Sequence, residues 1–333
     1  MENAVTLRCG DGGKYTNSLI KDVFYRHFGN ELLTNSMDAA VFDLNKERLA
    51  FTTDSFVVKP LFFPGGDIGK LAVCGTINDL SVSGAKPLYL SCSVIIEEGF
   101  DIKTLTKIAE SIGDACKKTG VKIITGDTKV VEKGSVDGIF INTSGIGVVL
   151  EEYNSKPIID GDCIIITGGI AEHGTTIAVE RYNINIEGKI QSDCMPLNNI
   201  IEKLQKNLKY IKIMKDPTRG GVATALNEIA EKSNMGVILN EESIPIEKEI
   251  KSVNEMLGLD PLYLACEGRM IIVAEKQKSK DLLEEIKCIT GCENSTIIGN
   301  FTCDIKSKVL METVIGGKRI IGPLEENLLP RIC

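Results

Sequence analysis

Runs of β-branched residues alternate with an amphipathic stretch in the first half of the chain. The segments 48–58 (RLAFTTDSFVV), 121–131 (VKIITGDTKVV) and 138–150 (GIFINTSGIGVVL) are β-branched runs interrupted by polar residues, which predicts three strands. The segment 101–120 carries apolar residues at helical spacing and ends in two lysines and a glycine, as helices often do. We therefore expect mixed α and β structure in this half.

The same alternation resumes after a polar stretch at 151–162, which is the best candidate for a linker. A strand is expected at CIIIT, and apolar periodicity from Val222 predicts a helix after DPTRGG. At 333 residues the chain exceeds the size at which one core usually stops growing. We expect two α/β domains, at 1–150 and 160–321, followed by a tail at 322–333.

Composition and charge narrow the class of partner. A hydrophobic content of 43% and a charged content of 25% are those of a globular protein, and a net charge of -8 argues against nucleic acid or an anionic membrane as the main partner. No secretory pattern or membrane-spanning apolar run is present, so we expect a cytoplasmic protein with reduced cysteines. The spacing of Cys288 and Cys292 does not favour a structural zinc site.

Four aspartates of the first half stand beside small or hydroxyl residues. They are Asp38 in MDAAV, Asp54 in TTDSF, Asp79 in NDLSVSGAKP and Asp127 in TGDTKVV. Any one of them alone is most simply a turn or cap residue. If the fold brings them together, their mutual repulsion would raise their pKa values unless cations lay among them. Oxygen ligands favour Mg²⁺ with phosphate oxygens completing its shell, so magnesium nucleotide is the expected ligand.

Three glycine-rich stretches are weaker candidates for anion binding. CGDGGK (9–14) offers backbone N–H groups and Lys14 but lacks Walker A spacing. DPTRGG precedes a helix, so its amides and Arg219 would meet an anion at that helix N-terminus, and TGGIAEHGTT (167–176) has the same potential. As isolated patterns, all three are more often plain turns.

The chain closes with LLPRIC. A terminal side chain is the least constrained in a molecule, so Cys333 is a candidate nucleophile or carrier thiol. Chance is the alternative, because the chain has 11 cysteines.

These motifs together resemble the HypE family of hydrogenase maturation proteins, within the aminoimidazole ribonucleotide synthetase (PurM-like) superfamily. The resemblance runs from about residue 7 to Cys333. It rests on TTDS, FFPGGDIGKLAVCGT, NDLSVSGAKP, YLSCSVIIEEG, TGDTKVV, FINTSGIG, DPTRGG, the EG of ACEGR, and PRIC. The aspartate motifs are shared across the superfamily and indicate only ATP and Mg²⁺, whereas TGDTKVV with a closing PRIC is far more specific.

The resemblance implies a two-domain α/β fold of the α+β type and a homodimer. The N-terminal domains would pair to form a shared β-barrel with an ATP cleft nearby. It also implies that Cys333 receives a carbamoyl group from the carbamoyltransferase HypF, and that ATP-dependent dehydration then gives a thiocyanate. The cyanide would pass to the iron of a [NiFe] hydrogenase precursor held by HypC and HypD.

The expected site residues follow from the motifs and the resemblance. By resemblance, Lys129 and Glu267 stand beside the reacting carboxamide. Glu267 would have the raised pKa that a general base needs, and Lys129 would neutralise the oxygen or phosphate. The expected Mg²⁺ ligands are Asp54, Asp79 and Asp127, with Asp38 and Asp216 as further candidates. The expected nucleotide-binding residues are Gly10, Gly12, Gly13, Lys14, Asn142, Thr218 and Arg219.

Two departures from the family pattern bear on these assignments. Asp11 stands where the family more often has serine, and its charge would repel a triphosphate unless a metal intervened. Cys266 and Arg269 replace the commoner Asn and Lys around Glu267.

Two other functions remain open. A selenophosphate synthetase or thiamine-phosphate kinase would act on a free small molecule and leave PRIC without a use. A non-catalytic carrier would use Cys333 only to dock a partner or metal, and loss of Lys129 or Glu267 would leave its function intact.

Overall fold

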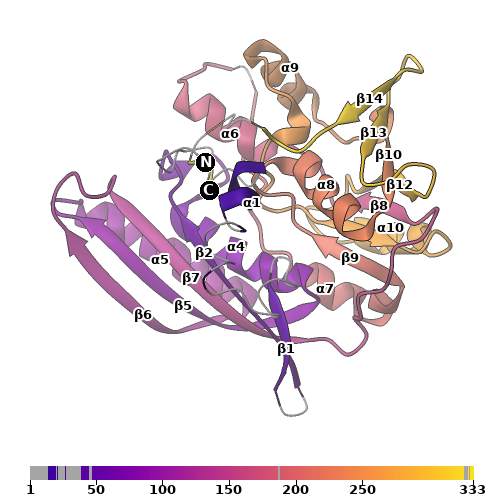
Figure 1. The fold of residues 1–333 in the computed structure, drawn as a ribbon. Helices are drawn as coiled ribbons and strands as arrows, with labels where there is room; N and C mark the ends of the chain where they lie inside the picture. The colour runs from indigo at the N-terminus through magenta and orange to yellow at the C-terminus, as the bar shows by residue number, and fades with distance from the viewer. Residues whose placement is uncertain are drawn as a thin grey trace.

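The computed structural model describes residues 14–19, 21, 27, 39–44, 47–186, 188–325, 329 and 331–333. Two α/β halves follow one another along the chain (Figure 1). The first half contains α1 (Lys14–Leu19), β1 (Ala40–Leu44), β2 (Glu47–Phe56), β3 (Phe62–Phe63), β4 (Gly66–Asp67), α4 (Ile68–Val82), β5 (Ala85–Glu97), α5 (Ile102–Thr119), β6 (Lys122–Val131) and β7 (Ile139–Val149).

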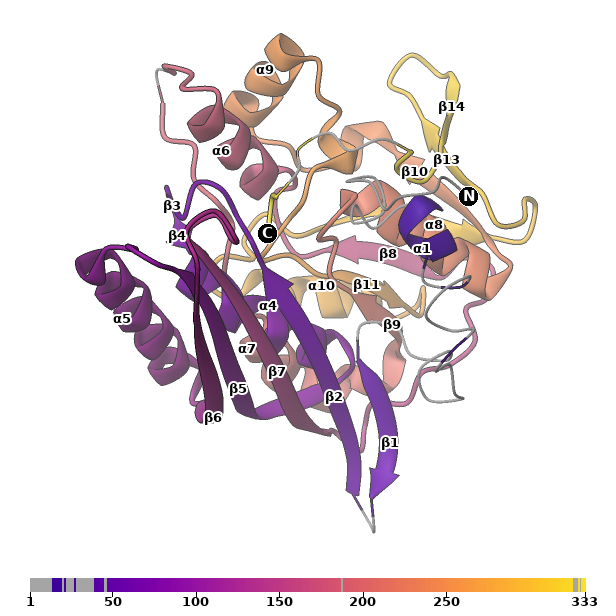
Figure 2. The same ribbon diagram turned by 60° about the vertical axis from the view of Figure 1, so that its left-hand side comes forward.

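The first half is built on a five-stranded sheet in the order β1-β2-β7-β5-β6. All neighbours are antiparallel except β5 and β6, which run parallel. Helices α4 and α5 cover one face, while the other face is turned toward the viewer in Figure 2. The three strands and the helix predicted for this half are confirmed as β2, β6, β7 and α5. Helix α5 begins after the cap Asp101 and ends at Gly120, whose φ of 74° suits glycine.

Helix α4 is buried on almost every side, which places it between the sheet and the second half. Its N-cap residue Asp67 accepts hydrogen bonds from the backbone N–H groups of Gly69 and Lys70. A Cβ atom at Gly75 would lie 2.8 Å from the ring of Phe56 and 3.8 Å from Oδ2 of Asp54. Glycine at this position therefore lets α4 approach β2 closely beside an aspartate.

The second half is built on a seven-stranded sheet in the order β14-β13-β10-β12-β8-β11-β9. Its elements are β8 (Cys163–Ile166), α6 (Glu172–Arg181), α7 (Asn198–Leu204), η3 (Gln205–Tyr210), β9 (Ile211–Lys215), α8 (Gly221–Ser233), β10 (Gly236–Asn240), η4 (Glu241–Ser243), α9 (Lys248–Leu257), η5 (Pro261–Tyr263), β11 (Ile271–Ala274), α10 (Ser279–Lys287), β12 (Thr296–Thr302), β13 (Val309–Glu312) and β14 (Lys318–Ile321). The predicted strand at CIIIT and the predicted helix after DPTRGG are confirmed as β8 and α8.

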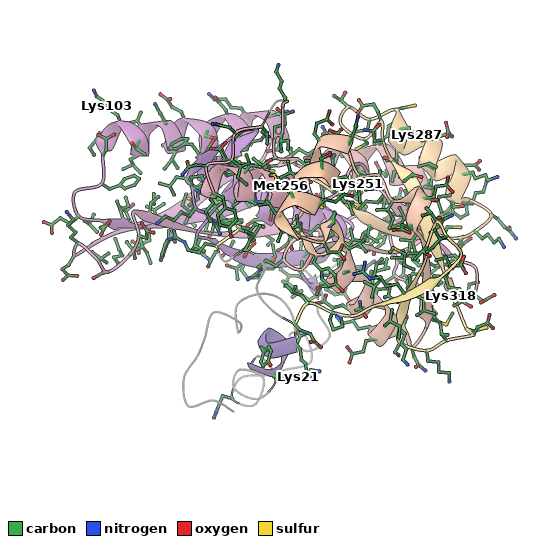
Figure 3. All side chains as sticks on the ribbon, turned by 90° about the horizontal axis from the view of Figure 1, so that it is seen from above. Lys21, Lys103, Lys251, Met256, Lys287 and Lys318 are labelled. Carbon is green, nitrogen blue, oxygen red and sulfur yellow. The ribbon has the colours of Figure 1, made fainter. Side chains whose placement is uncertain are left out.

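The two halves share their hydrophobic core. In β8, Ile164 and Ile166 pack in one cluster with Phe56 and Ile68 of the first half. Ile165 points to the opposite face and packs in a second cluster with Leu80. Seen from above, the halves lie side by side, with Lys103 of α5 at one end and Lys287 and Lys318 at the other (Figure 3). Among the described residues, no helix is long and apolar enough to cross a membrane.

The C-terminal tail crosses from the second half to the first. The hydroxyl of Tyr263 donates to the carbonyl of Gly322 over 3.0 Å. Farther along, the backbone N–H groups of Val57 and Lys59 donate to the carbonyls of Cys333 (3.1 Å) and Arg331 (3.2 Å). The end of the tail therefore lies along the segment that follows β2, where Figure 2 marks the C-terminus.

Candidate active site

A cavity of about 170 Å³ lies where the two halves and the tail meet. It is lined by Thr52, Thr53, Asp54, Gly75, Asp79, Asp216, Thr218, Arg219, Glu267 and Cys333. These residues come from β2, α4, the segment between β9 and α8, the loop before β11, and the end of the tail. The fold thus brings seven of the predicted site residues to one place: Asp54, Asp79, Asp216, Thr218, Arg219, Glu267 and Cys333.

Two hydrogen bonds explain how distant segments meet here. The hydroxyl of Thr52 donates to Oδ2 of Asp79 over 2.7 Å, which joins β2 to α4. The backbone N–H of Cys266 donates to the carbonyl of Pro217 over 3.0 Å, which places ACEGR against DPTRGG. Both bonds connect residues that flank or form the motifs.

Glu267 is the most buried carboxyl group of the cavity, with 2% of its surface exposed. Within the described part of the chain, its Oε1 atom is buried and has no hydrogen-bond partner. Burial raises its pKa well above the usual value, and the negative charge of Asp193 raises it further. A buried carboxyl with an unpaired oxygen has the environment that a general base requires.

The backbone around Glu267 is held firmly. Nδ2 of Asn78 donates to the carbonyl of Glu267 over 3.1 Å. The two carboxylate oxygens of Asp193 accept from the N–H groups of Glu267 and Gly268, each over 3.2 Å. A Cβ atom at Gly268 would collide with the carbonyl of Asp193, so glycine permits this close approach.

The thiol of Cys333 lies beside Glu267 and Arg219. Burial raises the pKa of Cys333 well above the usual value, the charge of Glu267 adds to this increase, and Arg219 opposes it. The thiol in this position is therefore protonated at neutral pH.

The pKa of Asp54, like that of Cys333, is raised by burial and lowered by Arg219. Burial raises its pKa, while the guanidinium of Arg219 and the N–H of Ser55, which donates to Oδ1 over 2.8 Å, lower it. Arg219 is therefore the guanidinium cation among the carboxyl groups of this cavity.

Asp127, Lys129 and Asn142 do not line this cavity, although Nδ2 of Asn142 donates to the backbone carbonyl of Asp54 over 2.8 Å. The sheet register places Asp127 beside Ser93, Ser93 beside Asn142, and Asn142 beside Ser55. This row crosses the face that α4 and α5 leave uncovered, whereas Asp54 points toward α4. Three strand spacings separate Asp127 from β2, which is about 14 Å. Within one chain, Asp127 and Lys129 therefore do not line the cavity.

Lys129 and Asp127 form an exposed pair with each other. The Nζ atom of Lys129 is 3.3 Å from Oδ2 of Asp127, and their side chains are 69% and 60% exposed. Such a pair contributes little to stability, so both groups are available for another role. Lys14, the first residue of α1, is likewise exposed and outside the cavity. The predictions for Gly10, Gly12, Gly13 and Asp38 lie outside the described residues.

The cavity suits a magnesium-bound phosphate better than a metal held by protein ligands alone. In the part of the chain that the structure describes, no three His, Cys, Asp or Glu side chains are grouped to hold a metal ion. The carboxylates of Asp54, Asp79 and Asp216 nevertheless offer only oxygen atoms to the same small space. Mg²⁺ commonly uses one or two carboxylates and takes its other ligands from phosphate and water. These residues therefore fit the expected ion with phosphate present.

Several residues of the site were not predicted individually from the sequence. Asn78, Asp193 and Gly268 act through backbone contacts that depend on the packing of the two halves. Four residues of the site lie within motifs quoted above, but nothing marked them individually: Thr52 in TTDS, Gly75 in FFPGGDIGKLAVCGT, Asn78 in NDLSVSGAKP and Gly268 in ACEGR. A neighbouring position in a motif was the only available sign.

A second cavity, of about 490 Å³, is lined in part by the loop that carries Asp193. There Arg269 donates to the carbonyls of Gly169 (2.9 Å) and Gly291 (2.8 Å) and to Oε2 of Glu172 (2.6 Å). The departure from lysine at position 269 thus supplies a planar group whose three nitrogen atoms each donate within the protein. Burial raises the pKa of Glu172 to about 7, although Arg269 opposes the shift.

The chain is similar to known proteins over nearly its whole length. Residues 36–149 match the family model of AIR synthase related proteins, N-terminal domain, and residues 160–311 match the corresponding C-terminal domain. The chain is 44% identical over 332 residues to carbamoyl dehydratase HypE of Bradyrhizobium diazoefficiens, covering 99% of this chain and 96% of that protein. It is 37% identical over 338 residues to carbamoyl dehydratase HypE of Escherichia coli, covering 99% and 100%.

Solved structures show the same relationship. A chain in a crystal structure of a HypE–HypF complex is 46% identical, with a TM-score of 0.86 and coverage of 92% of this chain and 100% of that one. HypE in complex with ATP is 42% identical, with a TM-score of 0.83 and coverage of 99% and 100%. ThiL complexed with AMPPCP and TMP, at 15% identity and a TM-score of 0.70, covers 95% and 99% and shares the fold.

Proposed function

The chain belongs to the HypE family, several of whose curated members are named carbamoyl dehydratases, and we propose that it dehydrates a carbamoyl group carried on Cys333 to a thiocyanate, with ATP as co-substrate. The observation that carries this proposal is the position of Cys333 beside Glu267 in one cavity. A thiol and a buried base with a free oxygen are the two groups that a dehydration on the thiol itself requires.

The chemistry balances with these groups. The carboxamide oxygen attacks the terminal phosphate of ATP, and ADP leaves. One N–H proton is lost as the phosphorylated intermediate forms. The second leaves as the carbon–oxygen bond breaks, which releases phosphate and leaves a nitrile on sulfur. Glu267 would take these protons in turn, and Arg219 would stabilise negative charge on the departing oxygen, since both line the cavity with Cys333.

Asp54, Asp79 and Asp216 would hold Mg²⁺ together with the phosphate oxygens, and Thr218 would contact the phosphate. When bound, the ion supplies a Lewis acid that neutralises phosphate charge. The cavity of about 170 Å³ is small beside the roughly 300 to 1,000 Å³ of sites that bury a whole nucleotide-sized ligand. The base and ribose would therefore lie outside it, where Gly10, Gly12, Gly13, Lys14 and Asn142 are the proposed contacts.

Lys129 and Asp127 would reach the cavity of a second copy of the chain. The uncovered face of the sheet carries exposed apolar side chains, among them Phe51 (47%), Tyr89 (42%) and Ile95 (41%). Pairing of two such faces would bury them and form the shared β-barrel of a homodimer. Lys129 would then act beside the carboxamide, and Asp127 and Asp38 would complete the magnesium ligands.

The proposed partners follow the family. HypF would load the carbamoyl group onto Cys333, and the similarity to a chain of the HypE–HypF complex supports this pairing. The cyanide would then be delivered to iron held by HypC and HypD during maturation of a [NiFe] hydrogenase in the cytoplasm. In domain terms, 1–150 would bind ATP and dimerise, 160–321 would complete the cleft, and 322–333 would move as a tail between loading and reaction.

Mass spectrometry of the full chain tests the proposal. After incubation with HypF, a carbamoyl donor, ATP and Mg²⁺, the C-terminal peptide should first gain one carbamoyl group. It should then lose the mass of one water while phosphate is released. Cys333→Ala should abolish both changes, whereas Cys303→Ala, which removes an exposed cysteine elsewhere, should leave them intact.

Each outcome of this experiment has a definite meaning. A C-terminal peptide that never gains a carbamoyl group, although HypF is active, would remove the role of Cys333. A peptide that gains the group but is never dehydrated would favour the carrier over the enzyme.

A further inference from the structure

His173 contacts the backbone at the end of the tail. It is carried by α6, and none of its surface is exposed. Its Nε2 atom is 2.7 Å from the carbonyl oxygen of Ile332, and its Nδ1 atom is 2.8 Å from the hydroxyl oxygen of Ser192. The ring of Phe63 meets the imidazole edge to face, with the ring centres 5.3 Å apart. The imidazole therefore contacts both halves of the protein and the tail.

The neighbours of His173 fix its tautomer. A carbonyl oxygen can only accept, so Nε2 carries the proton and donates it to Ile332. The backbone N–H of Cys194 donates to the hydroxyl oxygen of Ser192 over 3.0 Å, so that hydroxyl directs its own proton to Nδ1 of His173. Burial also lowers the pKa of His173, which keeps the ring neutral. A continuous series of hydrogen bonds thus runs from Cys194 through Ser192 and His173 to Ile332 in the tail.

The hydrogen bond from His173 to Ile332 acts next to Cys333, the residue proposed to carry the reacting group. The carbonyl of Ile332 belongs to the peptide group that joins Ile332 to Cys333, so holding it fixes the direction in which the Cys333 side chain leaves the backbone. Ile332 is itself 9% exposed and packs in the shared core. If the tail left, the buried Nε2–H group would lose its acceptor, which is unfavourable.

Besides the backbone bonds from Val57 to Cys333 and from Lys59 to Arg331, the other hydrogen bonds at the end of the tail come from arginine side chains at its rim. Arg331 donates from Nε to the carbonyl of Val57 over 2.8 Å and pairs with Asp137, whose side chain is 54% exposed. Arg181 donates to the carbonyl of Arg331 over 2.9 Å. Exposed ion pairs are screened and exchange readily with water. The buried bond from His173 is therefore the side-chain contact best suited to hold Cys333 in position, together with the backbone bond from Val57 to Cys333.

We propose that His173 is a positioning residue that seats Cys333 in the cavity beside Glu267, with Ser192 fixing the imidazole tautomer. This inference rests on the proposed function, in which Cys333 carries the reacting group. His173 touches neither that group nor the nucleotide and acts only through the carbonyl of Ile332.

The rate of thiol labelling measures how often the end of the tail leaves its position and exposes Cys333. Cys333 in the full-length protein with ATP and Mg²⁺ is reacted with a neutral thiol reagent, and the C-terminal peptide is followed by mass. His173→Leu removes the donor at similar size and should speed labelling about tenfold, the factor that corresponds to about 1.4 kcal/mol. His173→Gln can place an amide N–H near the position of Nε2 and should stay close to the parent rate. Ser192→Ala should be intermediate.

The same digests contain the control. Cys292 is buried in the other core cluster, so its labelling should not change in any variant. In the reaction, His173→Leu should accept the carbamoyl group at the parent rate and dehydrate it about tenfold more slowly, with an unchanged KM for ATP. A residue that only supported folding would not separate loading from dehydration or leucine from glutamine.

Two results would overturn the inference. One is equal labelling of Cys333 in the parent protein and His173→Leu. If His173→Leu fails to fold, equal labelling of Cys333 in the parent protein and in Ser192→Ala would overturn the inference instead. The inference and the proposed function can also fail separately. A parent protein that never gains a carbamoyl group contradicts the function, while the labelling rates still decide whether His173 holds the tail.

Discussion

The backbone N–H of Glu267 donates to Oδ1 of Asp193 over 3.2 Å, so one carboxylate both holds the proposed base and repels its charge. After burial, Asp193 is the largest cause that raises the pKa of Glu267. A base must lose its proton before it can act, so the rate of dehydration should rise with pH through the pKa of Glu267.

Asp193→Asn should move this pH dependence. The substitution removes a negative charge and therefore lowers the pKa of Glu267, so the acidic limb of the rate profile should shift to lower pH. The maximal rate should also fall several-fold, because the amide cannot accept from both N–H groups. Single-turnover dehydration of carbamoylated protein across pH 5 to 9 measures both effects. Asp281→Asn, an exposed change on α10, is the matched control, and an unshifted limb would contradict the role of Asp193.

Glu267→Gln should stabilise the protein while it abolishes dehydration. The pKa of Glu267 is raised on folding, so the folded chain retains a proton that the unfolded chain releases. The free energy of unfolding therefore falls as pH rises above the unfolded value near 4.5, and glutamine removes this loss. We expect a gain of about 1 to 3 kcal/mol at pH 8 by urea denaturation. A less stable variant at pH 8 would show that Glu267 is ionised and well paired.

The same reasoning applies to Glu172 with a defined pH window. Burial raises its pKa from 4.5 to about 7, so the folded chain holds one extra proton between these values. Glu172→Gln should match the parent protein at pH 4.5 and exceed its free energy of unfolding increasingly up to pH 7, with a constant difference above that. If the ion pair with Arg269 dominates instead, the variant will be less stable at pH 8 than at pH 5, relative to the parent protein.

The sequence predicted strands β2, β6, β7 and β8, two helices and the motifs of the cavity, because alternation and capping are local properties. It also placed Glu267 and Arg219 in motifs that the fold brings together. What it could not place was the direction of each side chain across the sheet. Asp54 and Asp127 each interrupt a similar β-branched run, yet Asp54 points toward α4 and Asp127 lies on the opposite face. Strand register decides this, and a shift of one residue would reverse it.

His173 and Asp193 illustrate a second limit. Their partners are backbone groups of Ile332, Glu267 and Gly268, at separations of 159, 74 and 75 residues. Any residue can offer a backbone group, so no residue pattern signals such a contact. The contacts that hold the end of the tail could therefore be found only from the tertiary structure.

Subunit mixing tests whether Lys129 acts in the cavity of a second copy. Lys129→Ala and Glu267→Gln should each be inactive as pure proteins. In mixed dimers, the chain with Lys129→Ala keeps its own Glu267 and would receive Lys129 from its partner. After random exchange of equal amounts, about a quarter of all cavities should then be intact. The two chains differ in mass, so the thiocyanate should appear only on the Lys129→Ala chain.

The matched control for this experiment replaces the Glu267→Gln protein with the double variant Lys129→Ala, Glu267→Gln. No Lys129 is then present in any dimer, and activity should stay at background. If the original mixture also stays at background although light scattering shows dimers that have exchanged, Lys129 does not act across the interface. Thiocyanate on the Glu267→Gln chain would instead show that the base, rather than the lysine, is supplied by the partner. Lys129 lies on the uncovered face of the sheet, on a strand three spacings from β2, which lines its own cavity. This position leads us to expect recovery on the Lys129→Ala chain alone.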